Sequence, residues 1–374
     1  MSQVVRSHTL SLGIVGLPNS GKSTLFNALT KKSVPAENYP FCTLDKNVGV
    51  VQIPDERLSR LASFFDAKKI VPSSMTFVDI AGLVKGASKG EGLGNQFLSH
   101  IREVDVILYI LRAFHSEEIV HVYNRIDPID DFEIVQSELI IKDIEVLEKR
   151  YDSVKRNSRS GVTDTIKLEL DTLEKTLEWL GEGKPVIDMK LNDDQKSILH
   201  TLFLLTNKER VFLLNCKEGV ESTDIEKWIE KLGEISGDSE NRFVLTGDVK
   251  LLSDLAEMEE DEIGDFTQLL GKEPTSIEDV IKTAYDRLNL LTFYTGSSKE
   301  CNAWSIERGA TIKGAAGVIH TDLGKNFITA DVVNVEKMMD IGGWNKAKES
   351  GLIKNQGKDY LVKDGDYVII LANT

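Results

Sequence analysis

The stretch Gly16-Leu-Pro-Asn-Ser-Gly21-Lys22-Ser23-Thr24 decides the fold of this 374-residue chain. It fits the pattern G-x-x-x-x-G-K-[ST], it directly follows the apolar run Leu10–Val15, and it opens the helical pattern Thr24–Leu29. The glycines let the backbone wrap closely around phosphates, and the helix N-terminus adds a favourable dipole. The motif therefore predicts a P-loop, with nucleotide contacts from Asn19, Ser20, Gly21, Lys22, Ser23 and Thr24.

The residues after Gly21 carry the predicted chemistry of this loop. Lys22 is expected to reach the β- and γ-phosphates as the catalytic cation, and Ser23 to ligate Mg²⁺ through its hydroxyl. Thr43 lies in the polar stretch where GTPases keep the threonine that closes over Mg²⁺ in the triphosphate state. We therefore predict a metal ligand at Thr43, with an ordinary loop threonine as the alternative.

A carboxylate is predicted to join the same site from a neighbouring strand. Asp79-Ile-Ala-Gly82 ends the apolar run Met75–Asp79, and parallel strands deliver their last residues to one edge of the sheet. We expect Asp79 to hold Mg²⁺ through water and the Gly82 N–H group to sense the γ-phosphate. The stretch from Lys85 to Gly94 contains four glycines in ten residues, which predicts a switch that orders on nucleotide binding.

Buried strands alternate with helical patterns along the first part of the chain. The continuously apolar runs are Leu10–Val15, Met75–Asp79, Val106–Leu111 and Val211–Asn215. They predict a doubly wound α/β sheet. Roughly 100 residues separate the last two runs, far more than a crossover needs, so a segment is inserted there. Apolar spacings of 3 and 4 within Ile134–Val154 and Ile166–Leu180 predict a helical coiled-coil hairpin, either a partner-docking arm or a purely structural element.

The sequence pattern changes from about Leu291 onward. Short strands punctuated by glycines are expected at Phe293–Thr295, Ala303–Ile306, Gly317–His320 and Tyr367–Leu371, with a helix at Val332–Met339. This pattern is typical of a small α+β domain. The expected organisation is a nucleotide-binding domain at 1–130 and 207–290, an inserted helical arm at 131–206, and a C-terminal domain at 291–374.

The composition excludes several classes of protein. No apolar run approaches the roughly 20 residues that span a bilayer, so we expect a cytoplasmic protein without a membrane partner. Cys42, Cys216 and Cys301 lie far apart, which argues against a disulfide framework or a zinc site. A formal net charge of −15 opposes nonspecific binding to DNA, and any contact with RNA has to be local.

The predicted base site departs from the guanine rule. GTPases normally carry Asn-Lys-x-Asp after the strand that corresponds to Val211–Asn215, and the Asp carboxylate accepts hydrogen bonds from guanine. Here the tetrad is Asn215-Cys216-Lys217-Glu218, with a carboxylate that is one methylene longer and a displaced lysine. Asn215, Cys216 and Glu218 remain the predicted base contacts. These residues alone leave ATP and GTP equally compatible with the site.

Taken together, these motifs resemble the YchF and Obg-like ATPase subfamily of Obg-related P-loop proteins. The likeness runs over nearly the whole chain and rests on Gly16–Thr24, Pro40–Thr43, Asp79–Phe97 and the Asn-x-x-Glu tetrad. It also includes a C-terminal TGS domain of β-grasp type, seen in Ala303–Ile306, Ala315–Asp322 and Gly357–Asp366. Two segments depart from the family pattern, Asp45-Lys46 and Thr246-Gly247-Asp248.

The resemblance implies an ATPase that prefers ATP over GTP, binds ribosomes, in particular the large subunit, and acts in translation and stress responses. RNA contacts through the TGS domain and the helical arm are implied as well. The alternatives are a GTP-hydrolysing translation factor, a non-catalytic adaptor with a structural nucleotide, and a small-molecule kinase, for which no acceptor or lid pattern is found.

Catalysis has to proceed without the usual glutamine, because Leu83 follows Gly82. The resemblance points to a histidine in a mobile loop, and the matching residue is His121, whose imidazole would accept a hydrogen bond from water. The alternative is a surface-helix histidine without a role. Asn19 stands where potassium-stimulated relatives place an asparagine that helps to ligate K⁺, so K⁺ joins Mg²⁺ as an expected cofactor.

Overall fold

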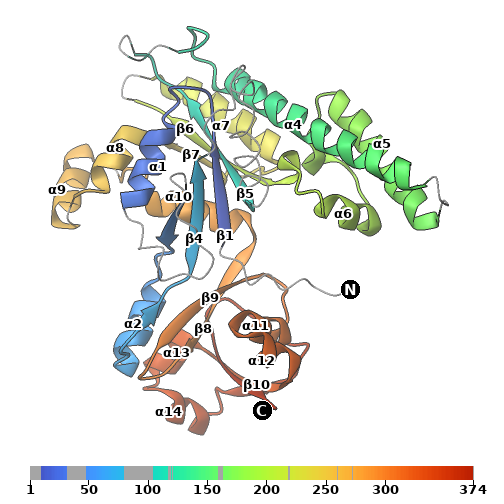
Figure 1. Cartoon of the computed structure of the whole chain (residues 1–374). Helices are drawn as coiled ribbons and strands as arrows, with labels where there is room; N and C mark the ends of the chain where they lie inside the picture. Colours follow the sequence, from blue (N-terminus) through green and yellow to red (C-terminus); the bar gives the residue numbers. More distant parts are fainter. Residues whose placement is uncertain are drawn as a thin grey trace. The chain divides into compact units, whose positions relative to one another are not determined.

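The computed structural model describes residues 10–31, 48–79, 104–116, 119, 121–158, 163–217, 220–258, 260–271 and 273–373. These residues divide into two compact units (Figure 1). The P-loop unit consists of the described residues within 11–49 and 76–284, and the C-terminal unit of those within 50–75 and 285–373. Each unit has its own six-stranded sheet.

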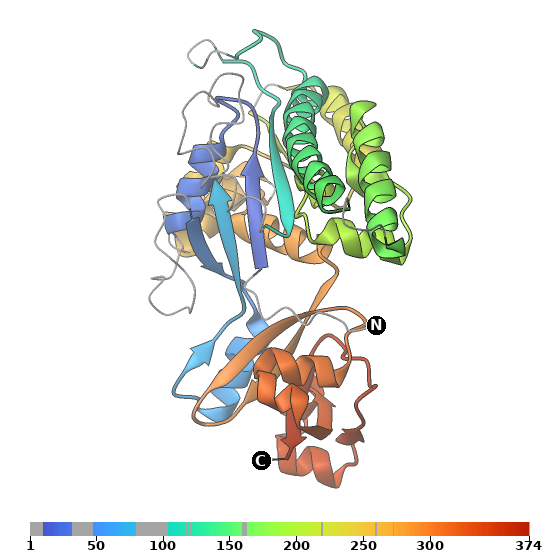
Figure 2. The ribbon, with the colours of Figure 1, turned by 45° about the vertical axis from the view of Figure 1, so that its right-hand side comes forward.

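The sheet that carries the P-loop has the order β2-β4-β1-β5-β6-β7. Its strands are β1 (Leu10–Val15), β2 (Val48–Gln52), β4 (Ser74–Asp79), β5 (Val106–Arg112), β6 (Glu209–Asn215) and β7 (Val244–Gly247). The strands β1, β5, β6 and β7 pair in parallel, and Figure 2 shows β4 beside β1 with the same direction. Every residue of β5 is buried, as expected for a strand covered on both faces.

Helices cover both faces of this sheet. The longest, α4 (Pro128–Asn157), begins at Asp127, whose carboxylate accepts hydrogen bonds from the first-turn N–H groups of Ile129 and Asp130. Phe132 of α4 packs edge-on against Tyr109 and Phe212 of the sheet. Outside the inserted segment, the other helices of the unit are α1 (Lys22–Lys31), α7 (Ser222–Ser236), α8 (Val249–Leu255), α9 (Glu260–Leu270) and α10 (Ile277–Arg287), which continues into the C-terminal unit.

The inserted segment forms a helical pair, as predicted. The helix α4 extends past the sheet and packs against α5 (Asp164–Gly181) around Leu147, Val154 and Leu173 (Figure 1). Shorter helices complete the segment: η4 (Val186–Asp188), α6 (Asp193–His200) and η5 (Leu205–Asn207). Residues 159–162, between α4 and α5 in the sequence, lie outside the described residues.

The buried Asp143 fastens α4 to the end of this insertion. Its carboxylate accepts hydrogen bonds from the Leu205 N–H at 2.8 Å, the Thr206 N–H at 2.7 Å and the Thr206 hydroxyl at 2.7 Å. The helical insertion is therefore tied to the segment that leads back into β6.

The C-terminal unit is built on a mixed sheet of order β11-β10-β12-β8-β9-β3. Its strands are β3 (Ile70–Val71), β8 (Leu290–Gly296), β9 (Cys301–Glu307), β10 (Phe327–Asn334), β11 (Lys354–Gln356) and β12 (Asp366–Ala372). One face is covered by α11 (Ile312–Ile319), which is followed by α12 (Thr321–Lys325). The other face packs against α2 (Glu56–Phe65), α13 (Val335–Asp340) and α14 (Trp344–Glu349).

Two expected elements of this unit are wrong. Gly317–His320 is not a strand, because Gly317 to Ile319 end α11, which Thr311 caps at its start. The small residues serve helix packing, since a Cβ on Gly324 of α12 would lie 2.8 Å from the Gly317 Cα. The predicted helix at Val332–Met339 begins only at Val335. Residues 332–334 belong to β10, where they pair with β12, and Asn334 caps α13.

Residues 50–75 belong to the C-terminal unit, although the expected boundaries placed them in the nucleotide-binding domain. The Tyr294 hydroxyl donates to Asp55 at 2.5 Å, and Arg57 pairs with Asp364 at 2.6 Å. Leu58 and Leu61 of α2 are buried in the core with Tyr294. Helix α2 is thus an integral part of the C-terminal unit.

Two further expectations concern membrane segments and thiols. Among the helices within the described ranges, none is long and apolar enough to cross a membrane. Within the described ranges, neither Cys216 nor Cys301 forms a disulfide, and Cys42 lies outside them.

Candidate nucleotide-binding site

The P-loop connects β1 to α1 at the carboxyl edge of the sheet. Gly16 approaches the neighbouring strand so closely that a Cβ would lie 2.4 Å from the Ile110 carbonyl oxygen. Gly21 has φ +110°, and a Cβ there would lie 2.7 Å from Asn215 Nδ2. Only glycine fits these two positions without strain. The spacing of the motif therefore fixes a compact loop that ends at the N-terminus of α1.

Lys22 folds back on the loop that it belongs to. Its Nζ donates to the carbonyl oxygens of Gly16 at 2.9 Å and Leu17 at 2.8 Å. Burial lowers the pKa of Lys22, and the nearby Asp79 carboxylate opposes this effect. A phosphate group would offer the ammonium group a charged partner in place of two neutral carbonyls, so the lysine is placed to bind one.

Asp79 ends β4, and one oxygen of its carboxylate is buried. Among the described residues its Oδ1 has no hydrogen-bond partner. Burial raises the pKa of this carboxyl, and the charge of Lys22 opposes the shift. A buried carboxylate with a free oxygen fits a water bound to Mg²⁺, and Ser23 lies at the start of α1 with an exposed side chain. These residues fit the predicted metal.

Other parts of the predicted site lie outside the described residues, namely Thr43, Gly82, Glu218 and the stretch Lys85–Gly94. Within the described ranges, no three His, Cys, Asp or Glu side chains gather into a metal cluster. Ser23 and Asp79 are the described residues that would hold a metal there, and phosphate oxygens would be further ligands.

Asn215, predicted to contact the base, also holds the site together. At the end of β6 its Nδ2 donates to the Ser20 carbonyl at 2.8 Å, and its Oδ1 accepts from the Val249 N–H at 3.1 Å. The side chain is buried and links the P-loop to the start of α8. The next residue, Cys216, is partly buried, and its N–H donates to the Gly247 carbonyl.

A buried aromatic ring lies beside this tetrad. The Lys217 Nζ stands 4.7 Å from the centre of the Phe114 ring, and the Arg112 guanidinium carbon 4.5 Å from it. Sequence reasoning missed both Arg112 and Phe114. The sequence signal was an arginine at the end of the apolar run of β5. An arginine in that place usually indicates where a strand ends and does not indicate a buried cation.

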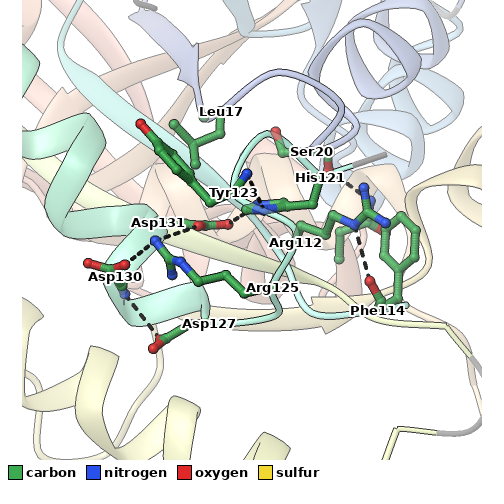
Figure 3. A network of polar contacts seen from close by, with 12 residues as sticks. Leu17, Ser20, Arg112, Phe114, His121, Tyr123, Arg125, Asp127, Asp130 and Asp131 are labelled. Atoms are coloured by element: carbon green, nitrogen blue, oxygen red, sulfur yellow. Dashed lines mark hydrogen bonds and ion pairs between the residues drawn. The ribbon is translucent and has the colours of Figure 1, made fainter. Parts of the chain in front are cut away.

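His121 follows β5 and is buried rather than placed on a surface helix. Its Nε2 lies 3.0 Å from Asp131 Oδ2, and its Nδ1 accepts a hydrogen bond from the Tyr123 N–H at 3.2 Å (Figure 3). Arg125 pairs with Asp130 and lies 3.7 Å from Asp131 Oδ1. Arg112 donates to the carbonyls of Phe114 at 3.1 Å and Ile119 at 2.8 Å.

The chain is similar to known proteins over nearly its full length. A curated protein of Bacillus subtilis (strain 168), "Ribosome-binding ATPase YchF", is 41% identical over 96% of this chain and 98% of its own length. The protein of the same name from Escherichia coli O157:H7 is 42% identical over the same shares. The chain belongs to the YchF family. This result confirms the resemblance predicted from the motifs.

Family models and a solved structure agree with YchF membership. Residues 11–148 match the family described as "50S ribosome-binding GTPase". Residues 290–373 match the YchF GTPase C-terminal family, whose description is "Protein of unknown function (DUF933)". The solved Schizosaccharomyces pombe YchF GTPase superposes with a TM-score of 0.80 at 35% identity, covering 97% of this chain and 98% of the other. The predicted α/β P-loop fold with a second domain is confirmed.

Proposed function

We propose that this chain is a Mg²⁺-dependent P-loop hydrolase that prefers ATP over GTP and acts as a ribosome-associated switch in translation or stress responses. The observation that carries the proposal is that Lys22 of the P-loop and Asp79 at the end of β4 lie close enough for each group's charge to oppose the other's pKa shift. The names of the curated relatives support both ATP as substrate and the ribosome as partner.

GTP is the second candidate substrate, because the similar solved structure is titled a YchF GTPase. The departures of the Asn215 tetrad from the guanine rule favour ATP when they are combined with the relatives' names. Titration calorimetry with ATP and GTP, each with Mg²⁺ present and then chelated, together with phosphate release, tests the choice. Tighter binding and faster turnover of GTP would overturn the preference for ATP.

The substitution Lys22→Ala tests whether the P-loop binds and hydrolyses the triphosphate. We expect it to abolish phosphate release and to weaken triphosphate binding, because it removes the main cation directed at the phosphates. Lys31→Ala is the control, since that exposed lysine ends the same helix and pairs with Glu257. A Lys22→Ala protein with near-normal turnover would contradict the site, whereas intact ATP that stays bound to the parent protein would favour a non-catalytic adaptor.

Within this proposal, Ser23, Thr43 and Asp79 would hold Mg²⁺, and Gly82 and Glu218 would contact the γ-phosphate and the base. When bound, Mg²⁺ would neutralise charge that develops on the phosphates. Lys22 would hold the same oxygens, and His121 would accept a hydrogen bond from the attacking water. His121→Ala is then expected to lower kcat by about 10²-fold or less with ATP affinity nearly unchanged.

Asn19 is proposed to help ligate K⁺ as an additional cation at the phosphates. It stands in the P-loop with a left-handed backbone, φ 63°, and its side chain is exposed. Such a cation would stabilise phosphate charge much as an arginine finger does. We expect faster hydrolysis in K⁺ than in Na⁺ at matched ionic strength, and a smaller difference in Asn19→Ala; equal rates in the two salts would remove K⁺ from the site.

The proposed partner surface comprises the helical insertion and the C-terminal unit, with the large ribosomal subunit and its RNA as partner. A TGS module of β-grasp type is proposed for residues 291–374. The order of its strands, with β12 parallel to β8 in the centre and α11 across one face, supports this assignment. Sedimentation with isolated ribosomal subunits in the presence of ATP tests the partnership.

A further inference from the structure

His121 is held so that neither ring nitrogen is available to water. The Tyr123 N–H can only donate, so Nδ1 must be the acceptor. Nε2 therefore carries the proton and donates it to Asp131 Oδ2. The residue is 6% exposed. An imidazole that orients water needs a free lone pair and contact with the solvent, and His121 has neither in this conformation.

Asp131 and two nearby arginines have buried polar atoms that could form further hydrogen bonds. Three buried atoms have no hydrogen-bond partner among the described residues: Asp131 Oδ1, Arg112 Nη1 and Arg125 Nη1. The charges of both arginines act on the Asp131 carboxyl or are acted on by it. A buried polar atom without a partner costs about 1–3 kcal/mol, so a rearrangement that pairs these atoms would gain free energy. If His121 leaves, the carboxylate keeps two arginines as neighbours.

The network lies beside the P-loop, and the segment that carries His121 is weakly anchored. Phe132, the neighbour of Asp131, shares one hydrophobic cluster with Leu17 of the P-loop, and Figure 3 shows both regions in one view. In the segment between His121 and α4, Val122 and Tyr123 are each 47% exposed. Movement of this segment would therefore bring little buried apolar surface into water.

We propose that Asp131 is a positioning residue that holds His121 in a resting conformation, and that hydrolysis requires His121 to leave it. The inference rests on the proposed role of His121 in turnover. The hydrogen bond between His121 and Asp131 is charge-assisted, so it keeps the population of released His121 small and the basal rate of hydrolysis low. Arg112 and Arg125 stabilise the carboxylate after release, so the release is reversible.

The first test is Asp131→Asn in the full-length protein. The amide oxygen can still accept from Nε2–H, but the bond loses its charge, and charge-assisted bonds are roughly twice as strong as neutral ones. We expect basal ATP turnover to rise about three- to ten-fold through a larger released population. The gain must vanish in the double variant with His121→Ala. Glu133→Gln, the same loss of charge at an exposed carboxylate two residues later on α4, should keep the parental rate.

A second readout needs no turnover. Diethyl pyrocarbonate modifies accessible, neutral imidazoles, and mass spectrometry measures the rate at each histidine. In nucleotide-free protein we expect faster modification of His121 in Asp131→Asn than in the parent or in Glu133→Gln. His320, whose side chain is 63% exposed, provides the internal reference and should react equally in all variants.

Arg125→Gln gives an independent test with the opposite sign. It removes one of the cations that stabilise Asp131 after release, so both turnover and His121 modification should fall below the parental values. Thermal melting identifies any variant that does not fold. If Asp131→Asn does not fold, the turnover and His121 modification of Arg125→Gln decide whether Asp131 holds His121 in a resting conformation.

The outcomes distinguish a failure of the resting role of Asp131 from a failure of the proposed role of His121 in turnover. If His121→Ala is slow but Asp131→Asn is also slower than the parent, Asp131 supports His121 during the reaction and the resting role is wrong. Unchanged modification of His121 in Asp131→Asn overturns it too. If His121→Ala hydrolyses ATP at the parental rate, the proposed role of His121 fails first and the resting role fails with it.

Discussion

At the scale of single residues, the site holds charged groups that the described protein atoms do not fully satisfy. Lys22 donates to two backbone carbonyls, and Asp79 keeps a buried oxygen without a described partner. Both groups are partly removed from water, which disfavours their charged forms. A phosphate group and its metal ion would supply charged partners for both groups, which favours binding of a nucleotide.

Asp79→Asn should therefore stabilise the nucleotide-free protein at neutral pH while it impairs Mg²⁺-dependent turnover. The pKa of Asp79 is raised in the folded protein, so its ionisation destabilises the fold as pH rises above the ordinary carboxyl value. An amide does not ionise. The gain in free energy of unfolding should be largest near pH 7 and should vanish as pH falls below about 4.

Urea denaturation of both proteins across this pH range measures the effect. Asp152→Asn, at an exposed position on α4, is the matched control and should leave the stability unchanged at every pH. A nucleotide-free Asp79→Asn protein that is less stable than the parent at pH 7 would contradict the expected burial cost.

The sequence predicts the residues of the site that belong to a local motif. Lys22, Ser23 and Asp79 follow from a strand, a glycine pattern and a helix start, which local physics determines. The carboxylate partner of His121 does not follow, because Asp130 and Asp131 both suit the first turn of a helix. Only the packing of α4 on the sheet selects which of the two faces the buried imidazole.

At the scale of elements, the hydrogen bonds of Asp143 determine how firmly the helical insertion is attached. Asp143→Asn should lower the free energy of unfolding by about 3 kcal/mol, since the amide nitrogen would face N–H donors that the carboxylate now satisfies. Equilibrium denaturation measures the loss. Glu145→Gln, at an exposed residue of the same helix that pairs with Lys142, should change the stability by less than about 0.5 kcal/mol. Equal effects of the two substitutions would refute the anchoring role.

Elements were predicted well where one force decides them. Buried strands such as β1 and β5 follow from continuous apolar runs, and α4 and α5 from helical periodicity. Gly317–His320 was misread because Val318 and Ile319 favour strands by propensity, whereas contact with Gly324 on α12 favours a helix there. Such a contact between small residues leaves no periodic signal in the sequence.

At the scale of the whole molecule, residues 285–374 are not expected to fold alone. Leu58 and Leu61 of α2 complete their core, and each buried leucine contributes roughly 1.5–3 kcal/mol. Together these contributions approach the entire stability of a small domain. We expect a 285–374 fragment to give poorly dispersed amide resonances, and co-expression with residues 50–75 to restore a dispersed spectrum. A cooperative, well-dispersed fragment without residues 50–75 would show that α2 is dispensable.

The discontinuous C-terminal unit also has a consequence for biosynthesis. Residues 50–75 leave the ribosome about 210 residues before their partners begin at Tyr285. At a translation rate of 5–20 residues per second, the strands that cover the apolar face of α2 are synthesised roughly 10–40 s after α2 itself. During this interval the nascent chain exposes Leu58 and Leu61 to chaperones and to other nascent chains. Slowed elongation should therefore lower the soluble yield of this protein more than that of a protein whose domains are continuous in sequence.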